Sequence, residues 1–100
     1  MHYGGSVSAL PTVTITYCTQ CRWLLRSAWL AQELLTTFES SLGAVTLVPA
    51  TGGVFHIYVD DMMLWERKRD GGFPDVKLLK QRVRDVIDPT KDLGHSEATP

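Results

Sequence analysis

The sequence is poor in the features that assign a chain quickly to a functional class. Its 10 basic and 11 acidic residues leave a formal net charge of −1, so electrostatics give no reason to expect nucleic acid or an anionic membrane as a partner. No run approaches the roughly 20 apolar residues of a membrane span. With 2 cysteines and 3 histidines, the chain also lacks the framework of a disulfide-rich secreted domain.

What is present is the composition of one globular domain, with 100 residues of which 44% are hydrophobic. Residues 1–11, which contain glycine and proline, predict a flexible lead-in, residues 12–89 the folded domain, and residues 90–100 a polar tail. The first of these segments has no Lys or Arg and no apolar block, unlike a signal peptide. We therefore expect a cytoplasmic location, where cysteines rest in the reduced state.

The most informative stretch is Tyr17-Cys18-Thr19-Gln20-Cys21, where a strand pattern meets a helical one. Residues 13–17 alternate and are β-branched, which predicts a strand. Residues 20–42 carry an apolar stripe at helical spacing, which predicts a helix closed by Gly43. Further apolar residues widen the stripe, so this helix is either well buried or touches a second chain, as in a homodimer. The stripe comprises Leu24, Ala28, Ala31, Leu35, Phe38 and Leu42, and Trp23, Trp29, Leu30 and Leu34 widen it.

Two cysteines three residues apart at a helix start suit thiol–disulfide exchange. Their Cα atoms can lie at the roughly 5.5 Å that a disulfide requires, and the amides and macrodipole of a helix start favour the reactive thiolate. We expect Cys18, nearer the exposed rim of the helix start, to attack and Cys21 to resolve. The alternatives are two thiols without a role and half of a zinc site, but His2, His56 and His95 have no zinc-finger spacing.

The second half of the chain predicts more strands and a last helix. Residues 44–48 form the nearly continuous apolar run of a buried strand. Residues 54–59 and 62–67 flank Asp60-Asp61 and predict a hairpin, in which Asp61 must tolerate a positive φ. We expect the basic run 67–69 to be a solvated strand end.

The last helix is expected to start with Pro74 at its first position and Asp75 at its positive end, and to stop at Asp88-Pro89. The element order is then β-α-β-β-β-α. A strand–helix–strand unit implies parallel pairing, and the hairpin adds antiparallel strands. This order predicts an α/β (α+β), thioredoxin-like fold: a mixed four-stranded sheet with both helices packed on it. The inward stripe of the last helix comprises Val76, Leu79, Val83, Val86 and Ile87, while Lys77, Lys80, Arg84 and Asp85 are expected to face water.

Candidate substrate-binding residues surround the cysteine pair. The loop Thr51-Gly52-Gly53 precedes a strand expected beside the cysteines, where glycines let a partner's backbone approach and Thr51 can hydrogen-bond a peptide or glutathione. A tight turn explains this loop equally well, and the same two interpretations apply to Phe73 after its two glycines. Tyr17 either leans over the site or packs into the core. Arg22 and Arg26 either support a thiolate or lie on solvated helix surface.

Four segments in order along the chain match a known pattern. They are Tyr17-Cys18-x-x-Cys21, Thr51-Gly52-Gly53-x-Phe55, Gly71-Gly72-Phe73-Pro74-Asp75, and Arg84-Asp85 through Pro89 to Leu93-Gly94-His95-Ser96. Over about residues 12–96 the chain thus resembles the selenoprotein W/T/H-like (Rdx) family and its bacterial, cysteine-only members. The resemblance implies a thioredoxin-like fold, a cytosolic location, no metal, no tightly held organic cofactor, and thiol-redox chemistry with glutathione or a thioredoxin system as electron partner.

Two departures from the family pattern bear on the chemistry. Selenium-containing relatives carry selenocysteine at the position of Cys21, which implies the reverse order of attack. His56 stands where relatives usually have an acidic residue.

The leading hypothesis is a small thiol–disulfide oxidoreductase in cell redox homeostasis, which forms a mixed disulfide with a protein client or glutathione through Cys18 and Cys21. The rival is a redox-sensitive protein-interaction module without turnover, in which residues 51–53 and the hairpin grip a protein. The third hypothesis is that the cysteine pair has a purely structural role.

Overall fold

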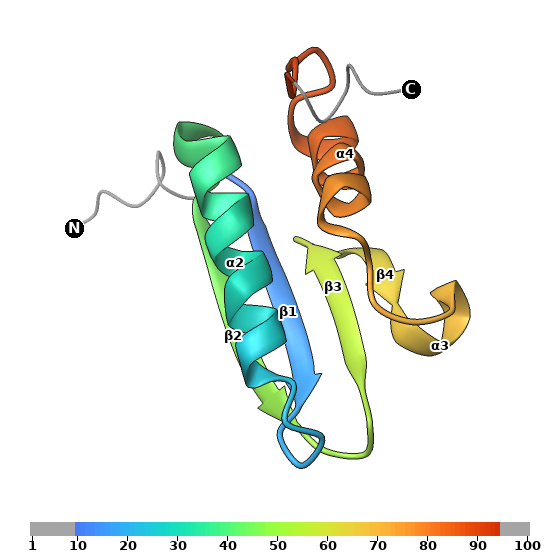
Figure 1. Cartoon of the computed structure of the whole chain (residues 1–100). Helices are drawn as coiled ribbons and strands as arrows, with labels where there is room; N and C mark the ends of the chain where they lie inside the picture. Colours follow the sequence, from blue (N-terminus) through green and yellow to red (C-terminus); the bar gives the residue numbers. More distant parts are fainter. Residues whose placement is uncertain (1–9, 95–100) are drawn as a thin grey trace, which may run out of the picture.

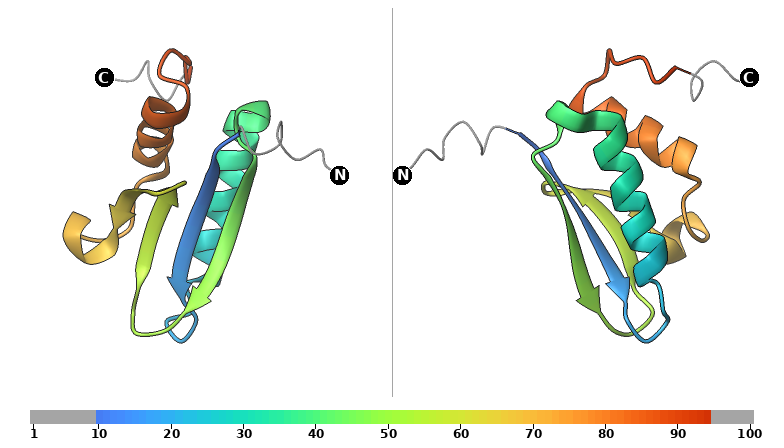
Figure 2. Two further views of the ribbon diagram at one scale, coloured as in Figure 1. Left: turned by 180° about the vertical axis from the view of Figure 1, so that it is seen from behind. Right: turned by 60° about the vertical axis from the view of Figure 1, so that its left-hand side comes forward.

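The computed structural model describes residues 10–94, and within them the chain forms a sheet with strand order β2-β1-β3-β4 (Figure 1). Both longer helices lie on one face of this sheet (Figure 2). Residues 1–9 of the predicted lead-in and residues 95–100 of the predicted tail, with His2 and His95, fall outside the described residues. The elements are β1 (Thr12–Cys18), α2 (Leu24–Phe38), the 3-10 turn η1 (Glu39–Ser41), β2 (Ala44–Ala50), β3 (Phe55–Val59), β4 (Met62–Glu66), α3 (Arg67–Asp70) and α4 (Val76–Ile87).

The central strand β1 organises the sheet. Its alternating pattern puts Val13, Ile15 and Tyr17 into the core, as the sequence predicts. It pairs parallel with β2 and antiparallel with β3. The predicted mixed sheet and the predicted parallel pairing across the helix are therefore confirmed.

The strand β2 was expected to be buried, and this is wrong. It lies at the edge of the sheet, and its side chains alternate between half-buried and exposed. It also extends through Pro49, which pairs with Tyr17 of β1. Proline is accommodated at a sheet edge because its missing N–H then interrupts no hydrogen bond of the sheet.

The helix α2 is shorter than expected at both ends. It begins at Leu24, after Arg22 adopts a left-handed φ of 62°, and ends at Phe38, after which Glu39 has a φ of 39°. Gly43 is therefore not its cap. Gly43 instead permits a close approach of the chain before β1, because a Cβ there would lie 3.1 Å from the carbonyl oxygen of Leu10.

The buried face of α2 also differs from the expected stripe. Leu24 is 51% exposed and Leu35 is 45% exposed. Because the helix is apolar around most of its circumference, spacing alone did not decide which stripe the sheet would cover. The buried residues are Ser27, Leu30, Ala31, Leu34 and Phe38.

The predicted hairpin of β3 and β4 is confirmed, with Val59 paired to Met62. The residue with positive φ is Asp60 (49°), not Asp61. The backbone amide of Thr12 donates a hydrogen bond to Oδ1 of Asp60 at 3.0 Å. The turn is thereby tied to the start of β1.

The basic run forms α3, a short helix that the sequence analysis missed. Oε1 of Glu66 accepts from the amide of Arg69 at 2.7 Å, and Oδ2 of Asp70 accepts from the amide of Glu66 at 2.9 Å. Gly71 ends the helix in the left-handed conformation. These reciprocal bonds at the helix start fix the direction in which Arg67 leaves β4.

The helix α4 packs beside α2. Asp75 is its N-cap and accepts from the amides of Lys77 and Leu78, so the helix starts one residue after Asp75 and not at Pro74.

Lys80 of α4 was expected to face water, but its Nζ lies 2.9 Å from Oε1 of Glu33 on α2. Beyond the helix, Leu93 packs against the core, as do Val76 and Ile87. Arg84, also expected in water, donates to the carbonyl of Lys91 at 2.9 Å, whereas Val86 is 37% exposed.

Within residues 10–94, none of the helices combines the length and apolar character that crossing a bilayer requires.

Candidate functional site

The two cysteines lie between β1 and α2. Cys18 is the last residue of β1, and Cys21 lies in the turn that follows, three residues before α2 begins. The amide of Thr19 donates to the carbonyl of Ala50 at 2.9 Å, and its hydroxyl donates to the same oxygen at 3.2 Å. The cysteine turn is thus anchored to the end of β2. The expectation that the cysteines occupy the first helical turn is wrong, because the left-handed Arg22 separates them from the helix.

The two sulfur atoms are in direct contact. The Cys21 thiol donates to the sulfur of Cys18 over a distance of 2.7 Å. Both cysteines are in the free form. A contact this close, between residues three apart in sequence, places the pair ready for disulfide formation, which needs an approach to about 2.05 Å.

The exposure of the two cysteines is the reverse of what we expected. Cys18 is only 1% exposed, whereas Cys21 is exposed. The reason for naming Cys18 as the attacking residue, its position at an exposed rim, is therefore wrong. A disulfide that approaches from solvent meets Cys21 first.

The two thiols differ in acidity as well. The hydrogen bond from Cys21 is the main cause that lowers the pKa of Cys18, and the backbone amides of Gly53, Cys21 and Gln20 lower it further. The pKa of Cys21 is raised, first because its proton is held by Cys18 and then by desolvation, while the charge of Arg67 acts in the opposite direction. The Cys18 thiolate is therefore stabilised first by the Cys21 thiol and then by turn and loop amides.

The loop over residues 51–53 contributes through Gly53. Gly52 and Gly53 both have positive φ, 83° and 74°, which lets the chain turn sharply between β2 and β3. This turn presents the amide of Gly53 to Cys18. Thr51 and Gly52 are exposed beside it. Of the predicted binding loop, Gly53 is the residue that meets the sulfur pair.

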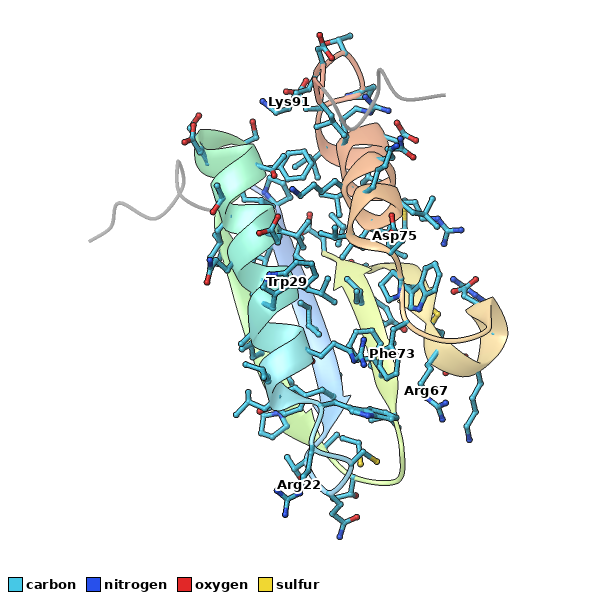
Figure 3. The ribbon with its side chains drawn as sticks, in the orientation of Figure 1. Arg22, Trp29, Arg67, Phe73, Asp75 and Lys91 are labelled. Carbon is cyan, nitrogen blue, oxygen red and sulfur yellow. The ribbon has the colours of Figure 1, made fainter. Side chains whose placement is uncertain are left out.

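Arg67 is a candidate site residue that the sequence analysis missed. Its guanidinium lies 5.0 Å from the ring centroid of Trp23, and its Nη2 is 3.5 Å from the carbonyl oxygen of Gly53. Its Nε is buried without a hydrogen-bond partner among the described residues. Figure 3 shows Arg67 reaching from α3 toward the end of the sheet that carries the sulfurs. The sequence around Arg67 does not predict these contacts, because a basic run of this kind is typical of solvated surface.

An aromatic cluster lies beside the cysteine turn. The rings of Trp23, Phe55 and Phe73 meet edge to face, with centroids 4.9 Å apart for both contacts of Phe73. Arg26 caps the cluster, with its guanidinium 4.0 Å from the centroid of Phe73. Phe73 thus joins the site from the loop before α4 (Figure 3). The interpretation that Arg26 lies on solvated helix surface is incomplete, because its guanidinium lies over the ring of Phe73.

Two other candidate residues, Tyr17 and His56, do not lie where a substrate at the sulfurs could contact them. Tyr17 is 7% exposed and belongs to the core cluster, so its ring offers no surface to a substrate. His56 pairs with Thr16 of β1 and stacks edge to face on Tyr58, on the sheet face opposite the core. The half-exposed strand position expected of His56 is confirmed. In the part of the chain that the structure describes, no three His, Cys, Asp or Glu side chains gather as a metal site would require.

Comparisons with known proteins match most of the chain. The model of the Rdx family matches residues 12–85. A crystal structure from Bordetella parapertussis has 63% sequence identity, a TM-score of 0.75, and a match covering 76% of this chain and 96% of that chain. A selenoprotein W-related protein from Vibrio cholerae has 56% identity and a TM-score of 0.77, with 79% and 99% covered. No curated protein matches. Together with the order of the elements, these similarities confirm the predicted thioredoxin-like fold.

Proposed function

This chain belongs to the Rdx family, and on that premise we propose that it is a small thiol–disulfide oxidoreductase acting through Cys18 and Cys21. The observation that carries the proposal is the contact between one exposed and one buried thiol, 2.7 Å apart. This arrangement suits an exchange reaction, because one sulfur can meet a client while the other waits behind it.

The first step assigns the attack to Cys21. In the reduced pair the thiolate rests on Cys18, whose pKa is lowered. The Cys21 proton passes to that thiolate, against the order of the two pKa values and therefore in a small fraction of the molecules. The Cys21 thiolate so formed attacks one sulfur of the client disulfide. The new bond joins Cys21 to that sulfur, and the other client sulfur leaves as a thiolate. The positive charge of Arg67, which favours ionised Cys21, supports this step. Exposure decides this assignment, because a thiolate at Cys18 is covered by its surroundings.

The second step assigns resolution to Cys18. Cys18 gives its proton to the client thiolate that left in the first step, and the amides that lower its pKa, among them that of Gly53, favour this loss. The Cys18 thiolate then attacks Cys21, closes the intramolecular disulfide and releases the second client sulfur as a thiolate. The client has gained two electrons and the protein has lost two. A reductant, glutathione or a thioredoxin system, must return them, as a reducing compartment such as the cytoplasm provides.

Trapping with single-cysteine variants tests the proposal. Reduced Cys18→Ser is expected to accumulate a mixed disulfide with a test disulfide, while reduced Cys21→Ser should form it at least about tenfold more slowly because its remaining thiol is buried. Mass spectrometry identifies the adducts, and the double variant is the control. Faster trapping by Cys21→Ser would reverse the assigned order. If the wild-type protein binds a client but reduces no disulfide, the interaction module without turnover is the better account.

A further inference from the structure

The first two turns of α2 carry an open groove that the reaction steps above do not use. It has a volume of about 380 Å³ and is lined by Arg22, Trp23, Leu25, Arg26 and Trp29. Leu25 is 82% exposed and Trp29 is 48% exposed. Exposed apolar side chains that lie together and are rimmed by polar residues mark binding sites. In Figure 3 the labelled Arg22 and Trp29 mark the two ends of this surface along α2.

The groove begins at the residue that follows the exposed Cys21. Arg22 follows the exposed Cys21 directly in the chain. Its left-handed φ of 62° turns the chain from the cysteine pair onto the helix surface. From Leu24 to Trp29 the helix rises by roughly 7.5 Å at about 1.5 Å per residue. A client whose disulfide meets Cys21 therefore has its neighbouring residues over the groove.

The charges of the groove select the chemistry of its occupant. Its lining, among the described residues, contains two arginines and no acidic side chain. The guanidinium of Arg22 has no hydrogen bond or ion pair within residues 10–94, and Arg26 is held over the ring of Phe73. A partner with a carboxylate beside an apolar side chain would complement both the arginines and the Trp–Leu floor.

Two other occupants fit less well. Glutathione supplies carboxylates but no apolar side chain to cover Leu25 and Trp29. A second copy, meeting this one through the same patch as two-fold symmetry requires, would set the arginines of both chains against each other.

We infer that the groove formed by Arg22, Trp23, Leu25, Arg26 and Trp29 binds an acidic and apolar segment next to the disulfide of a protein client. This inference rests on the proposed function and adds the client class: a polypeptide that is selected before its disulfide is attacked. The exchange itself follows the two steps given above, with the client disulfide as the oxidant and the Cys18–Cys21 dithiol as the reductant.

The test compares three pyridyl disulfides that differ in what flanks the reacting sulfur. The first is a cysteine peptide with Leu and Glu neighbours, the second has Lys in place of Glu, and the third is methyl pyridyl disulfide. The absorbance of released thiopyridone reports the rate of attack by the reduced full-length protein. At low salt the Glu peptide should react about tenfold faster than the Lys peptide, as one well-placed contact allows, and added salt should reduce the difference.

Variants locate the effect on the groove. Leu25→Ser should lower the rate with the Glu peptide about threefold to tenfold and leave the rate with methyl pyridyl disulfide unchanged. Because Arg22 adjoins Cys21, Arg22→Gln is read as a ratio: its rate with the Glu peptide should fall about threefold to tenfold relative to its own rate with methyl pyridyl disulfide. Leu35→Ser changes an exposed leucine of the same helix outside the groove, and Lys68→Gln removes an exposed positive charge. These two matched controls should behave as wild type. Circular dichroism confirms that each variant is folded.

The outcomes separate the two proposals. Equal rates with both peptides, unchanged in Leu25→Ser and Arg22→Gln, would overturn the groove while leaving the oxidoreductase intact. No thiopyridone from any of the three reagents would overturn the proposed function and the groove with it. Sedimentation of a dimer that Leu25→Ser dissociates would assign the groove to a second copy, and would also overturn the inference.

Discussion

Replacing Gly53 with alanine is expected to strain the fold and raise the pKa of Cys18 together. Gly53 has a φ of 74°, where a residue with a Cβ costs roughly 1–2 kcal/mol. The added Cβ would meet Nη2 of Arg67 at 3.9 Å, an ordinary contact, so steric overlap contributes little. The chain relieves the strain by turning toward negative φ, which moves the Gly53 amide away from the Cys18 sulfur that it stabilises.

Gly52→Ala is the matched control for this experiment. Gly52 has a φ of 83° and open space around its Cα, so alanine costs a similar strain there. Its amide is not among those that lower the pKa of Cys18. In a domain of this size 1 kcal/mol shifts the melting temperature by about 4–8 °C, so both variants should melt about 4–16 °C lower than wild type.

Two measurements on the reduced proteins separate strain from acidity. Thermal unfolding followed by circular dichroism reports the strain, and the ultraviolet absorbance of the thiolate against pH reports the lower pKa of the cysteine pair, at which the first thiolate, on Cys18, forms. Gly53→Ala should raise the pKa of Cys18 toward its ordinary value of 9.0, whereas Gly52→Ala should not. An equal pKa in both variants, at an equal loss of melting temperature, would refute the role given to the Gly53 amide.

Two predictions concern the loop that places Arg67. The side chain of Arg69, and then the Glu66 amide, lower the pKa of Asp70 below its ordinary value of 3.8. This stabilisation is present above the unfolded pKa and is lost as pH falls through the folded one, so Asp70→Asn should be less stable than wild type at neutral pH and equally stable in acid. Trp65→Phe should lose about 1–3 kcal/mol, because the carbonyl of Gly72 that accepts its Nε1–H at 2.8 Å is left unpaired. Urea unfolding measures both.

Asp70→Asn has a matched control. Asp85 has a 65% exposed side chain beside Arg84, so Asp85→Asn should change the free energy of unfolding very little. A loss in Asp85→Asn equal to that in Asp70→Asn would contradict the special role of Asp70. A Trp65→Phe variant as stable as wild type would show that water replaces the indole as partner of the Gly72 carbonyl.

The sequence predicted those parts of the fold in which local pattern and tertiary environment agree. The alternation of residues 13–17 and the two-residue turn Asp60-Asp61 led to β1 and to the hairpin, and both are present. The element order led to the mixed sheet. These features depend on neighbours in the chain, which a single sequence displays.

The predictions that were wrong concern features that tertiary packing determines, such as the burial of a strand or of one helix face. Residues 44–48 are as apolar as a central strand, yet β2 lies at an edge with one side toward water. In α2 the surplus of apolar residues hid the buried stripe, and Leu24 was placed inside although it is half exposed. The left-handed Arg22 carries no glycine or asparagine signal, so the late start of the helix was not visible.

The candidate site divides in the same way. The cysteine pair and Gly53 were recognised from spacing and composition, and the structure brings them together. Arg67 comes from a distant part of the sequence and owes its position to the short helix α3. The sequence also could not predict which of Cys18 and Cys21 is exposed, because their exposure depends on which residues cover the end of β1.

Pro49 in β2 has a consequence for how this chain behaves at high concentration. An edge strand offers unsatisfied backbone groups to any extended peptide, and such edges nucleate fibrous aggregates. Because Pro49 has no N–H to offer, the row of donors on the free side of β2 is broken one residue before the strand ends. The imide therefore interrupts edge-to-edge pairing at the end of β2 to which the cysteine turn is anchored.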